Sequence, residues 1–204
     1  MNAELLRALQ HQVEDVHLPS SFMTWWRLFS FDEKTGIVKK VVAQPNLIPY
    51  QGADVLARVL AGDVTLKAAS ILFEYQNTTG AIAVPTPTRD EGIDYYLTTI
   101  PLTPNRDYLR VALSAPVAFS SSDSAKYEGN QASFFAISSG IKGIHNEPFS
   151  SAAHSKVFGV GLVSTPDPDQ HTQDKLFSRS YDGFDPVPKE DGYQVGAQYV
   201  IRFR

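Results

Sequence analysis

The sequence predicts a mainly β protein: an antiparallel β-sandwich or jelly-roll-like domain with an N-terminal helix and one short bracing helix. From residue 64 onward, most of the chain consists of short stretches in which apolar and polar residues alternate. Loops rich in Gly, Pro, Ser and Asp separate these stretches at the spacing of a sandwich. The length of 204 residues suits one domain. We therefore expect a helical arm over residues 1–18 and a single β-rich domain over 19–204, with a short helix near 52–61.

The first predicted element is a helix with a narrow apolar face. Leu6, Leu9, Val13 and Val16 follow one another at spacings of three and four, and polar residues flank them. A thin apolar stripe at the end of a chain suits docking on a neighbouring surface. A terminal helix that packs on its own domain fits the same pattern, so both interpretations stay open.

A β-hairpin is predicted after the arm, because aromatic and polar residues alternate on both sides of a short turn at 32–36. Trp25 and Trp26 are adjacent, and adjacent side chains in a strand point to opposite faces. We therefore expect one of the two tryptophans to lie outside the local core, where a partner or another loop covers it.

Residues 50–63 predict a short amphipathic helix. Val55, Leu56, Val59 and Leu60 form its apolar stripe, and Gly62 follows where a left-handed C-terminal cap favours glycine. A helix of about ten residues is not stable alone. Its apolar face is therefore expected to lie against the rest of the fold, across the end of a β-sheet.

The remaining stretches predict strands at 69–77, 93–104, 108–120, 131–140, 155–164, 175–183 and 193–204. In the first of them, alternation predicts that Ala69, Ile71, Phe73 and Tyr75 point inward. In the last one, apolar side chains share one face: Val195, Ala197, Tyr199, Ile201 and Phe203. A strand whose pattern continues to the final residue needs a sheet to receive it. That sheet belongs either to the same chain or to a neighbouring subunit.

Composition excludes several classes of function. The net charge is −4, from 18 basic and 22 acidic residues, and no cluster of Lys and Arg suggests nucleic-acid binding. The absence of cysteine excludes disulfides, thiolate metal sites and a cysteine nucleophile. No apolar stretch approaches the ~20 residues that cross a bilayer, and the first residues lack the pattern of a secretory signal. We therefore expect a soluble protein that folds in a cytoplasm.

Candidate chemical sites are weak. His145, Glu147 and His154 lie close together, but two histidines nine residues apart in a loop match no standard metal-ligand spacing. An acidic loop resembles a calcium loop without its glycine and glutamate, which leaves a solvated turn or a weak divalent site; it contains Asp167, Asp169, His171 and Asp174. Gly159 and Gly161 lack the third glycine of a phosphate loop, so we expect a strand that another backbone or a large side chain approaches closely. We expect no enzyme activity, cofactor or metal.

Two other functions have candidate residues. A carbohydrate-binding module would need exposed aromatic side chains, and the candidates are Trp25, Trp26, Tyr95, Tyr96, Phe134, Phe135, Tyr181 and Tyr193. Aromatic residues in strands belong to the core more often than to a sugar platform. A glycan hydrolase would need two carboxylates at catalytic separation, for which the candidates are Asp90, Glu91 and Asp94.

The stretch NLIPYQGADVLARVLAGD at 46–63 resembles a recurrent opening of structural proteins of tailed bacteriophages. That opening consists of Asn-Leu-Ile, a short turn with glycine, a helix of the type Leu-Ala-x-x-Leu-Ala-Gly and then a strand. The residues that carry the likeness are Asn46, Gly52, Leu56, Ala57, Leu60, Ala61 and Gly62. Residues 134–149 and 154–179 also resemble segments of phage virion proteins.

The resemblance implies a structural component of a virion, assembled in the host cytoplasm as a homo-oligomer in contact with other virion proteins. A place in the tail, baseplate or neck and a place on the capsid both stay open, and a host glycan is the partner of the alternative, a receptor-recognition module. No nucleic acid or membrane partner is expected. The candidate interface residues are Leu6, Leu9, Val13, Val16, Trp25, Trp26, Tyr199, Ile201 and Phe203.

Overall fold

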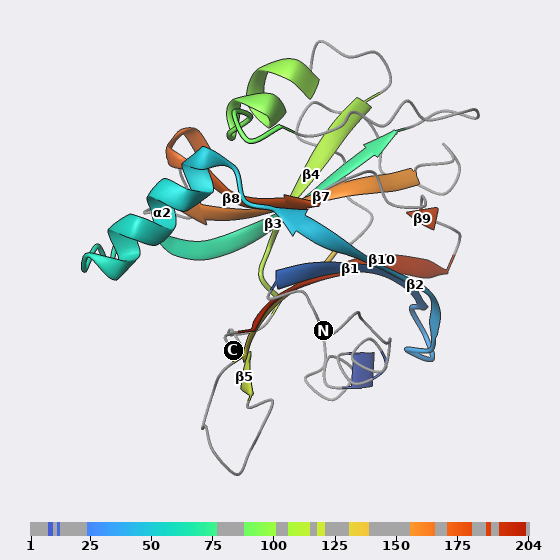
Figure 1. The fold of residues 1–204 in the computed structure, drawn as a ribbon. Coiled ribbons are helices and arrows are strands. Elements are labelled where there is room, and N and C mark those ends of the chain that lie inside the picture. Colours follow the sequence, from blue (N-terminus) through green and yellow to red (C-terminus); the bar gives the residue numbers. More distant parts are fainter. Residues whose placement is uncertain are drawn as a thin grey trace.

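The computed structural model describes residues 8, 9, 12, 24–76, 88–100, 106–114, 118–120, 131–138, 156–165, 171–180, 187–188 and 192–202. This part of the chain is mainly β, as the sequence predicts, and its strands form one curled antiparallel sheet (Figure 1). The strands are β1 (Thr24–Asp32), β2 (Val38–Leu47), β3 (Lys67–Gln76), β4 (Arg106–Ala112), β5 (Ala118–Ser120), β6 (Gln131–Ile137), β7 (Lys156–Thr165), β8 (Lys175–Ser180), β9 (Val187–Pro188) and β10 (Tyr193–Arg202). Their order is β4-β3-β7-β8-β2-β1-β10-β6-β5, and β9 pairs with β7.

Strand β2 is the point at which the sheet bends. It pairs with β1 along most of its length, whereas only Asn46 and Leu47 pair with β8. The sheet therefore has a first half, β5-β6-β10-β1-β2, and a second half, β8-β7-β3-β4. The two halves form separate layers in Figure 1, and buried side chains from both join in one cluster, here called the inner core.

The alternation that the sequence predicts for β3 and β10 is confirmed in the inner core. Trp26 contributes from β1, and its ring centroid lies 4.7 Å from that of Tyr199. Ile201 is half-buried against the same cluster. The predicted inward residues that the inner core contains are Ile71, Phe73, Tyr75, Val195, Ala197 and Tyr199.

The outer face of the second half is covered by a π-helical turn, η1 (Tyr95–Thr99), where the sequence predicts a strand over 93–104. That prediction is wrong for the described residues 93–100. Ile93, Tyr96 and Ile100 are spaced three and four apart, and all three are buried against β3, β4, β7 and β8 in the cluster that also contains Leu72, Tyr108, Val163 and Leu176. Aromatic and β-branched residues favour strands, but packing against the sheet overrides that preference here.

The outer face of the first half carries an aromatic cluster that includes a residue of the predicted arm. Leu9 has no exposed surface and packs with Phe29, Phe31, Phe135 and Ile137. Gln12 accepts the N–H of Val38 at 2.9 Å through Oε1 and donates to the carbonyl of Gly36 at 3.0 Å through Nε2, so it binds the β1–β2 turn. Of residues 1–18, the structure describes Ala8, Leu9 and Gln12.

The helix expected near 52–61 is present as α2 (Tyr50–Leu60), between β2 and β3. Gly62 has φ +99°, which confirms the predicted left-handed cap. The described helices include none with the length and apolar character that crossing a membrane requires.

Candidate functional site

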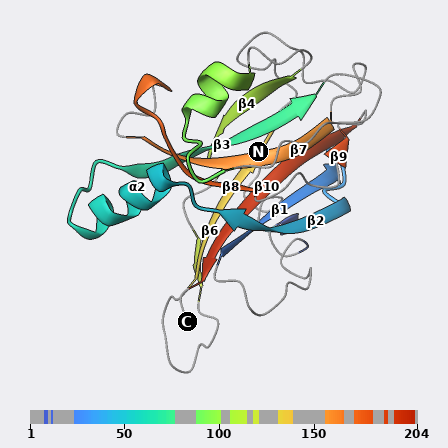
Figure 2. The same cartoon turned by 45° about the horizontal axis from the view of Figure 1, so that its top comes forward.

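Helix α2 lies to one side of the sheet and extends away from it in both views (Figures 1 and 2). Its first turn is fixed to strand β8. Gln51 Oε1 accepts the N–H of Leu176 at 2.6 Å and the N–H of Ile93 at 2.9 Å, which joins the helix start to β8 and to the segment before η1. A Cβ added at Gly52 would lie 2.0 Å from the carbonyl oxygen of Phe177, so only glycine permits this close approach.

The C-terminal end of α2 is fixed by local polar contacts. Arg58 Nη2 donates to Asp63 Oδ2 at 2.9 Å, and Asp63 Oδ1 accepts the N–H of Thr65 at 3.0 Å. The hydrogen bonds from the Thr65 side chain and backbone hold the pKa of Asp63 below its usual range. Because Arg58 and Asp63 neutralise each other, the end of the helix presents no unpaired charge from this pair.

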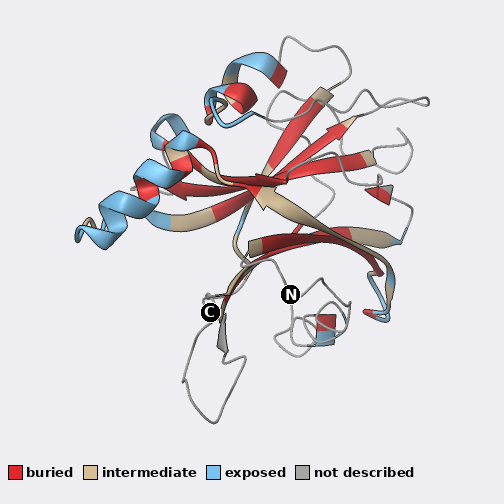
Figure 3. Cartoon of the chain, in the orientation of Figure 1, coloured by how far each residue is buried: buried red, intermediate tan, exposed pale blue. Residues whose placement is uncertain are grey.

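The apolar stripe of α2 is covered over only part of its width. Val55 is 3% exposed, whereas Leu56 is 40%, Val59 43% and Leu60 80% exposed. Val64, in the turn that follows, is 78% exposed. The expectation that the apolar face lies against the rest of the fold is therefore confirmed at Val55 and fails at Leu60, and Figure 3 shows most of the helix as exposed. We call Leu56, Val59, Leu60 and Val64 the exposed apolar edge.

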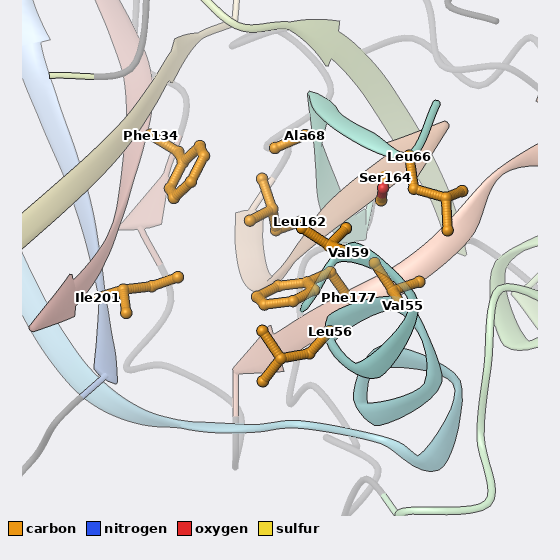
Figure 4. Close-up of a pocket in the computed structure, with 10 residues that line it drawn as sticks. All are labelled: Val55, Leu56, Val59, Leu66, Ala68, Phe134, Leu162, Ser164, Phe177 and Ile201. Carbon is orange, nitrogen blue, oxygen red and sulfur yellow. The ribbon is translucent and has the colours of Figure 1, made fainter. Parts of the chain in front are cut away.

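An open cavity of about 200 Å³ lies between α2 and the strands (Figure 4). The first half of the sheet contributes Phe134 and Ile201, on the opposite side from the α2 residues in Figure 4. Several walls of the cavity are also side chains that pack against the inner core, so the cavity is a place where that core opens beside the helix. The lining residues are Val55, Leu56, Val59, Leu66, Ala68, Phe134, Leu162, Ser164, Phe177 and Ile201.

Ser164 is the polar exception among these described lining residues. It is 3% exposed, and its Oγ is buried with no hydrogen-bond partner in the described part of the protein. A buried hydroxyl without a partner costs about 1–3 kcal/mol. Because this oxygen is itself closed off from solvent, the surface that the cavity presents is apolar.

A buried ionic network lies under η1 and is the second chemically distinctive feature. Glu74 has no exposed surface, and its carboxylate accepts from Arg179 at 3.2 Å and from the Tyr95 hydroxyl at 2.5 Å. Arg179 also donates to Glu91 Oε2 at 2.7 Å, and its guanidinium lies 3.8 Å from the Tyr95 ring centroid. Burial, followed by the charge of Glu74, raises the pKa of Tyr95 well above its usual value.

This network is closed to solvent at its centre, because Glu74 is fully buried and Arg179 is 4% exposed. Its contacts join η1 to strands β3 and β8. Of the carboxylates considered for glycan hydrolysis, Glu91 is bound to Arg179, whereas Asp90 and Asp94 are exposed. The geometry fits a structural contact better than a cleft that admits a substrate.

The prediction that something large approaches Gly159 and Gly161 is confirmed. A Cβ at Gly159 would lie 2.8 Å from Glu74 Oε2, and a Cβ at Gly161 would lie 2.9 Å from the hydroxyl of Tyr96. The two glycines of β7 therefore leave space for the Glu74 carboxylate and for the Tyr96 ring, which reaches from η1 to the sheet.

The candidate interface residues are distributed over several places. Leu9, Trp26 and Tyr199 have no exposed surface, and Trp25 is 4% exposed, so all four are covered within one chain. Trp25 lies on the face opposite to Trp26, below the guanidinium groups of Arg27 and Arg202. Ile201 lines the cavity beside α2. Leu6, Val13, Val16 and Phe203 lie outside the described residues.

Sequence reasoning placed no interface residue on α2 itself. One feature of the sequence indicates the exposed apolar edge. The stripe has four large apolar residues, and a short helix that touches a sheet along one line buries only part of a stripe of that width. Which side of that stripe stays uncovered depends on the contact with β8, for which the local pattern holds no information.

Other sequence candidates give no open site among the described residues. Trp25, Trp26, Tyr95 and Tyr96 are buried, and Tyr50 is the aromatic side chain with large exposure in that part of the chain. Asp174 pairs with Arg110 at 2.9 and 3.2 Å and lies 3.9 Å from His171. The described residues contain no group of three or more metal-ligating side chains. His145, Glu147, His154, Asp167, Asp169 and Tyr181 lie outside them.

Comparison with protein-family models, with curated proteins and with solved structures finds no match for this chain.

Proposed function

We propose that this chain is a structural protein that works through protein–protein contacts and assembles into the virion of a tailed bacteriophage. It would do so as a homo-oligomer in contact with other virion proteins, in the tail, baseplate or neck or on the capsid. The observation that carries the proposal is the exposed apolar edge of α2 beside an open apolar cavity. Contiguous apolar surface of this kind marks interaction sites in soluble proteins.

The rigidity of α2 supports this role. Gln51 and Gly52 fix its first turn to β8, and Gly62 with the Arg58–Asp63 pair fixes its last turn. A surface that is already ordered loses less conformational entropy when a partner binds. Because the local charges neutralise each other, a partner can cover the apolar edge without leaving this pair uncompensated.

The resemblance at 46–63 and the exposed edge involve the same residues, which links the assembly contact to a phage setting. Gly52 allows the helix to lie against β8, Leu56 and Leu60 belong to the exposed edge, and Gly62 ends the helix. Both halves of the sheet contribute side chains to the inner core, which supports the β-sandwich, jelly-roll-like arrangement that we assign to this domain. In this proposal the protein makes or breaks no bond and uses no cofactor.

The test is incorporation into particles. A tagged copy is supplied in cells that produce the corresponding phage, and particles are purified through a density gradient. We expect Leu60→Asp to remain at the top of the gradient, because an aspartate in a buried apolar contact leaves a charge without a partner. The matched control is Ile37→Asp in the β1–β2 turn, where the wild-type side chain is 62% exposed and distant in sequence from α2.

The control variant should sediment with particles as the wild type does. If Leu60→Asp also enters particles at the wild-type level, α2 is not the assembly contact and the proposal fails.

A further inference from the structure

We infer that residues 88–100 form a cap over the buried ionic network and that the first turn of α2 holds this cap closed, so that the cap and the helix open together. The cap consists of η1 and the turn that precedes it. The helix that carries the exposed apolar edge is then also the part that keeps Glu74 and Arg179 closed to solvent. This inference does not depend on the proposed function, because it concerns contacts within one chain.

Three neighbouring points of the cap are joined to two residues of α2. The Tyr50 N–H donates to the carbonyl of Arg89 at 2.9 Å, and Gln51 Oε1 accepts the N–H of Ile93 at 2.9 Å. A Cβ at Gly92 would lie 3.1 Å from the Gln51 amide, so the backbone of the cap also packs closely on that side chain. The position of the cap therefore depends on the position of the first turn of the helix.

The same glutamine oxygen joins the helix to the sheet. Gln51 Oε1 also accepts the N–H of Leu176 in β8 at 2.6 Å, and the next residue, Gly52, packs directly on the carbonyl of Phe177. One acceptor thus serves a donor in the cap and a donor in β8, so a movement of the helix away from β8 weakens both bonds at once. Segments that share contacts in this way open as one cooperative unit.

The charges below the cap allow it to open without unfolding of the sheet. Glu74, Arg106 and Arg179 lie on β3, β4 and β8, and the Glu74 carboxylate lies 3.8 and 3.2 Å from the two guanidinium groups. Opening of the cap removes the Tyr95 hydroxyl from Glu74 and the Glu91 carboxylate from Arg179. Each of the three charges on the strands still keeps a partner of opposite sign, so the opening avoids the large cost of an unpaired buried charge.

Amide hydrogen exchange of the isolated protein, combined with urea denaturation, tests the inference. The amides of Tyr96 and Leu97, which donate to the carbonyl of Ile93, report on the cap, and residues 53–60 report on the helix. We expect both sets of wild-type amides to open with the same equilibrium constant, and more often than the whole protein unfolds. Wild-type amides that exchange only through global unfolding overturn the inference.

Tyr95→Phe is the decisive variant, because it removes a bond between the cap and Glu74 and leaves the sequence of the helix unchanged. We expect exchange to become about tenfold faster in the cap and by the same factor in α2, the change expected for one lost hydrogen bond to a charged group. Glu91→Gln weakens the contact of the cap with Arg179 and replaces Tyr95→Phe if that variant does not fold. Faster exchange in the cap alone shows that the helix does not open with it, and the inference then fails.

Gln51→Leu acts from the side of the helix. It removes the acceptor that the cap shares with β8, so both sets of amides should again exchange about tenfold faster. Gln131→Leu is the matched control, because Gln131 is also half-buried and also accepts two hydrogen bonds, from Arg202, in the first half of the sheet. The control should leave exchange in the cap and the helix unchanged, and an effect of Gln51→Leu on only one of the two segments contradicts the inference.

Discussion

The two helical segments beside the second half of the sheet, η1 and α2, differ in how much of their apolar surface the chain covers. The five residues of η1 include Tyr95 and Tyr96, both buried; the Arg179 guanidinium lies over the Tyr95 ring, and Glu74 accepts the Tyr95 hydroxyl. In the eleven residues of α2, Gly52 and Val55 are buried. Both segments are apolar enough to pack, so apolar content alone does not say which one is part of the core. Uncovered apolar surface on a firmly held helix indicates a surface for a partner.

The buried ion pair under η1 should contribute far more to the free energy of unfolding than the exposed pair on α2. Arg179→Leu removes the closer of two cations beside the buried Glu74 and leaves Arg106 at 3.8 Å, so we expect a loss of about 3 kcal/mol in the free energy of unfolding, at the lower end for a broken buried pair. Arg58→Leu removes the exposed Arg58–Asp63 contact and should leave the free energy of unfolding nearly unchanged, because solvent screens the pair. Urea denaturation measures both values. Similar losses for the two variants would contradict the contrast between the regions.

Alanine substitution of one buried and one exposed leucine tests the same contrast between covered and uncovered apolar surface. Leu9→Ala removes a fully buried side chain from the Phe29–Phe31–Phe135 cluster, and we expect a loss of about 2–5 kcal/mol. Leu60→Ala, at an 80% exposed position, should change the stability of the isolated protein by less than about 0.5 kcal/mol. Thermal and urea unfolding at low protein concentration make the comparison. A neutral Leu9→Ala would mean that the predicted arm does not contribute to the core of a single chain.

Substitutions at two glycines of the α2 region distinguish the effect of close packing from the effect of backbone conformation. Gly52→Ala places a methyl group against the Phe177 carbonyl, so the helix must move away from β8, at a cost of about 1–3 kcal/mol. Gly62→Ala meets nothing within 4 Å and suffers only from its positive φ, at a cost of about 1 kcal/mol. Amide hydrogen exchange distinguishes them, because protection over 51–60 should fall mainly in Gly52→Ala. Equal exchange in the two variants would show that contact with β8 does not hold the helix.

Alkaline pH should weaken the packed region and leave α2 little changed. Burial raises the pKa of Tyr199 and that of Tyr108 to about 12, above the ordinary value of 10. The unfolded chain therefore loses these protons at a lower pH than the folded chain. The stability that the neutral tyrosines contribute is complete below about pH 10 and is lost as the pH rises toward 12. Tyr199→Phe should flatten the fall in melting temperature between pH 10 and 11.5, and Tyr50→Phe, at an exposed position, should not.

Periodicity predicted the parts of the fold that depend on local sequence. Alternation in 193–204 places Val195, Ala197 and Tyr199 in the inner core, and the same argument holds for β3. The helix at α2 and the left-handed Gly62 follow from spacing and from the conformational freedom of glycine. The strand predicted over 93–104 is wrong over its described part. The intrinsic preference of Tyr95 and Tyr96 is for a strand, but packing against the sheet stabilises a helical turn here.

The order of residues was sufficient to determine a β-rich chain, the faces of its strands and the presence of one short helix, because side-chain periods of two and of about 3.6 are properties of the local backbone. Tertiary structure alone decided that Glu74 meets Arg179, 105 positions away, and that Ser164 faces a cavity beside α2. It also decided which side of α2 stays in water. Such contacts depend on how the sheet bends at Asn46 and Leu47, and a local pattern specifies which residues are apolar without specifying what will cover them.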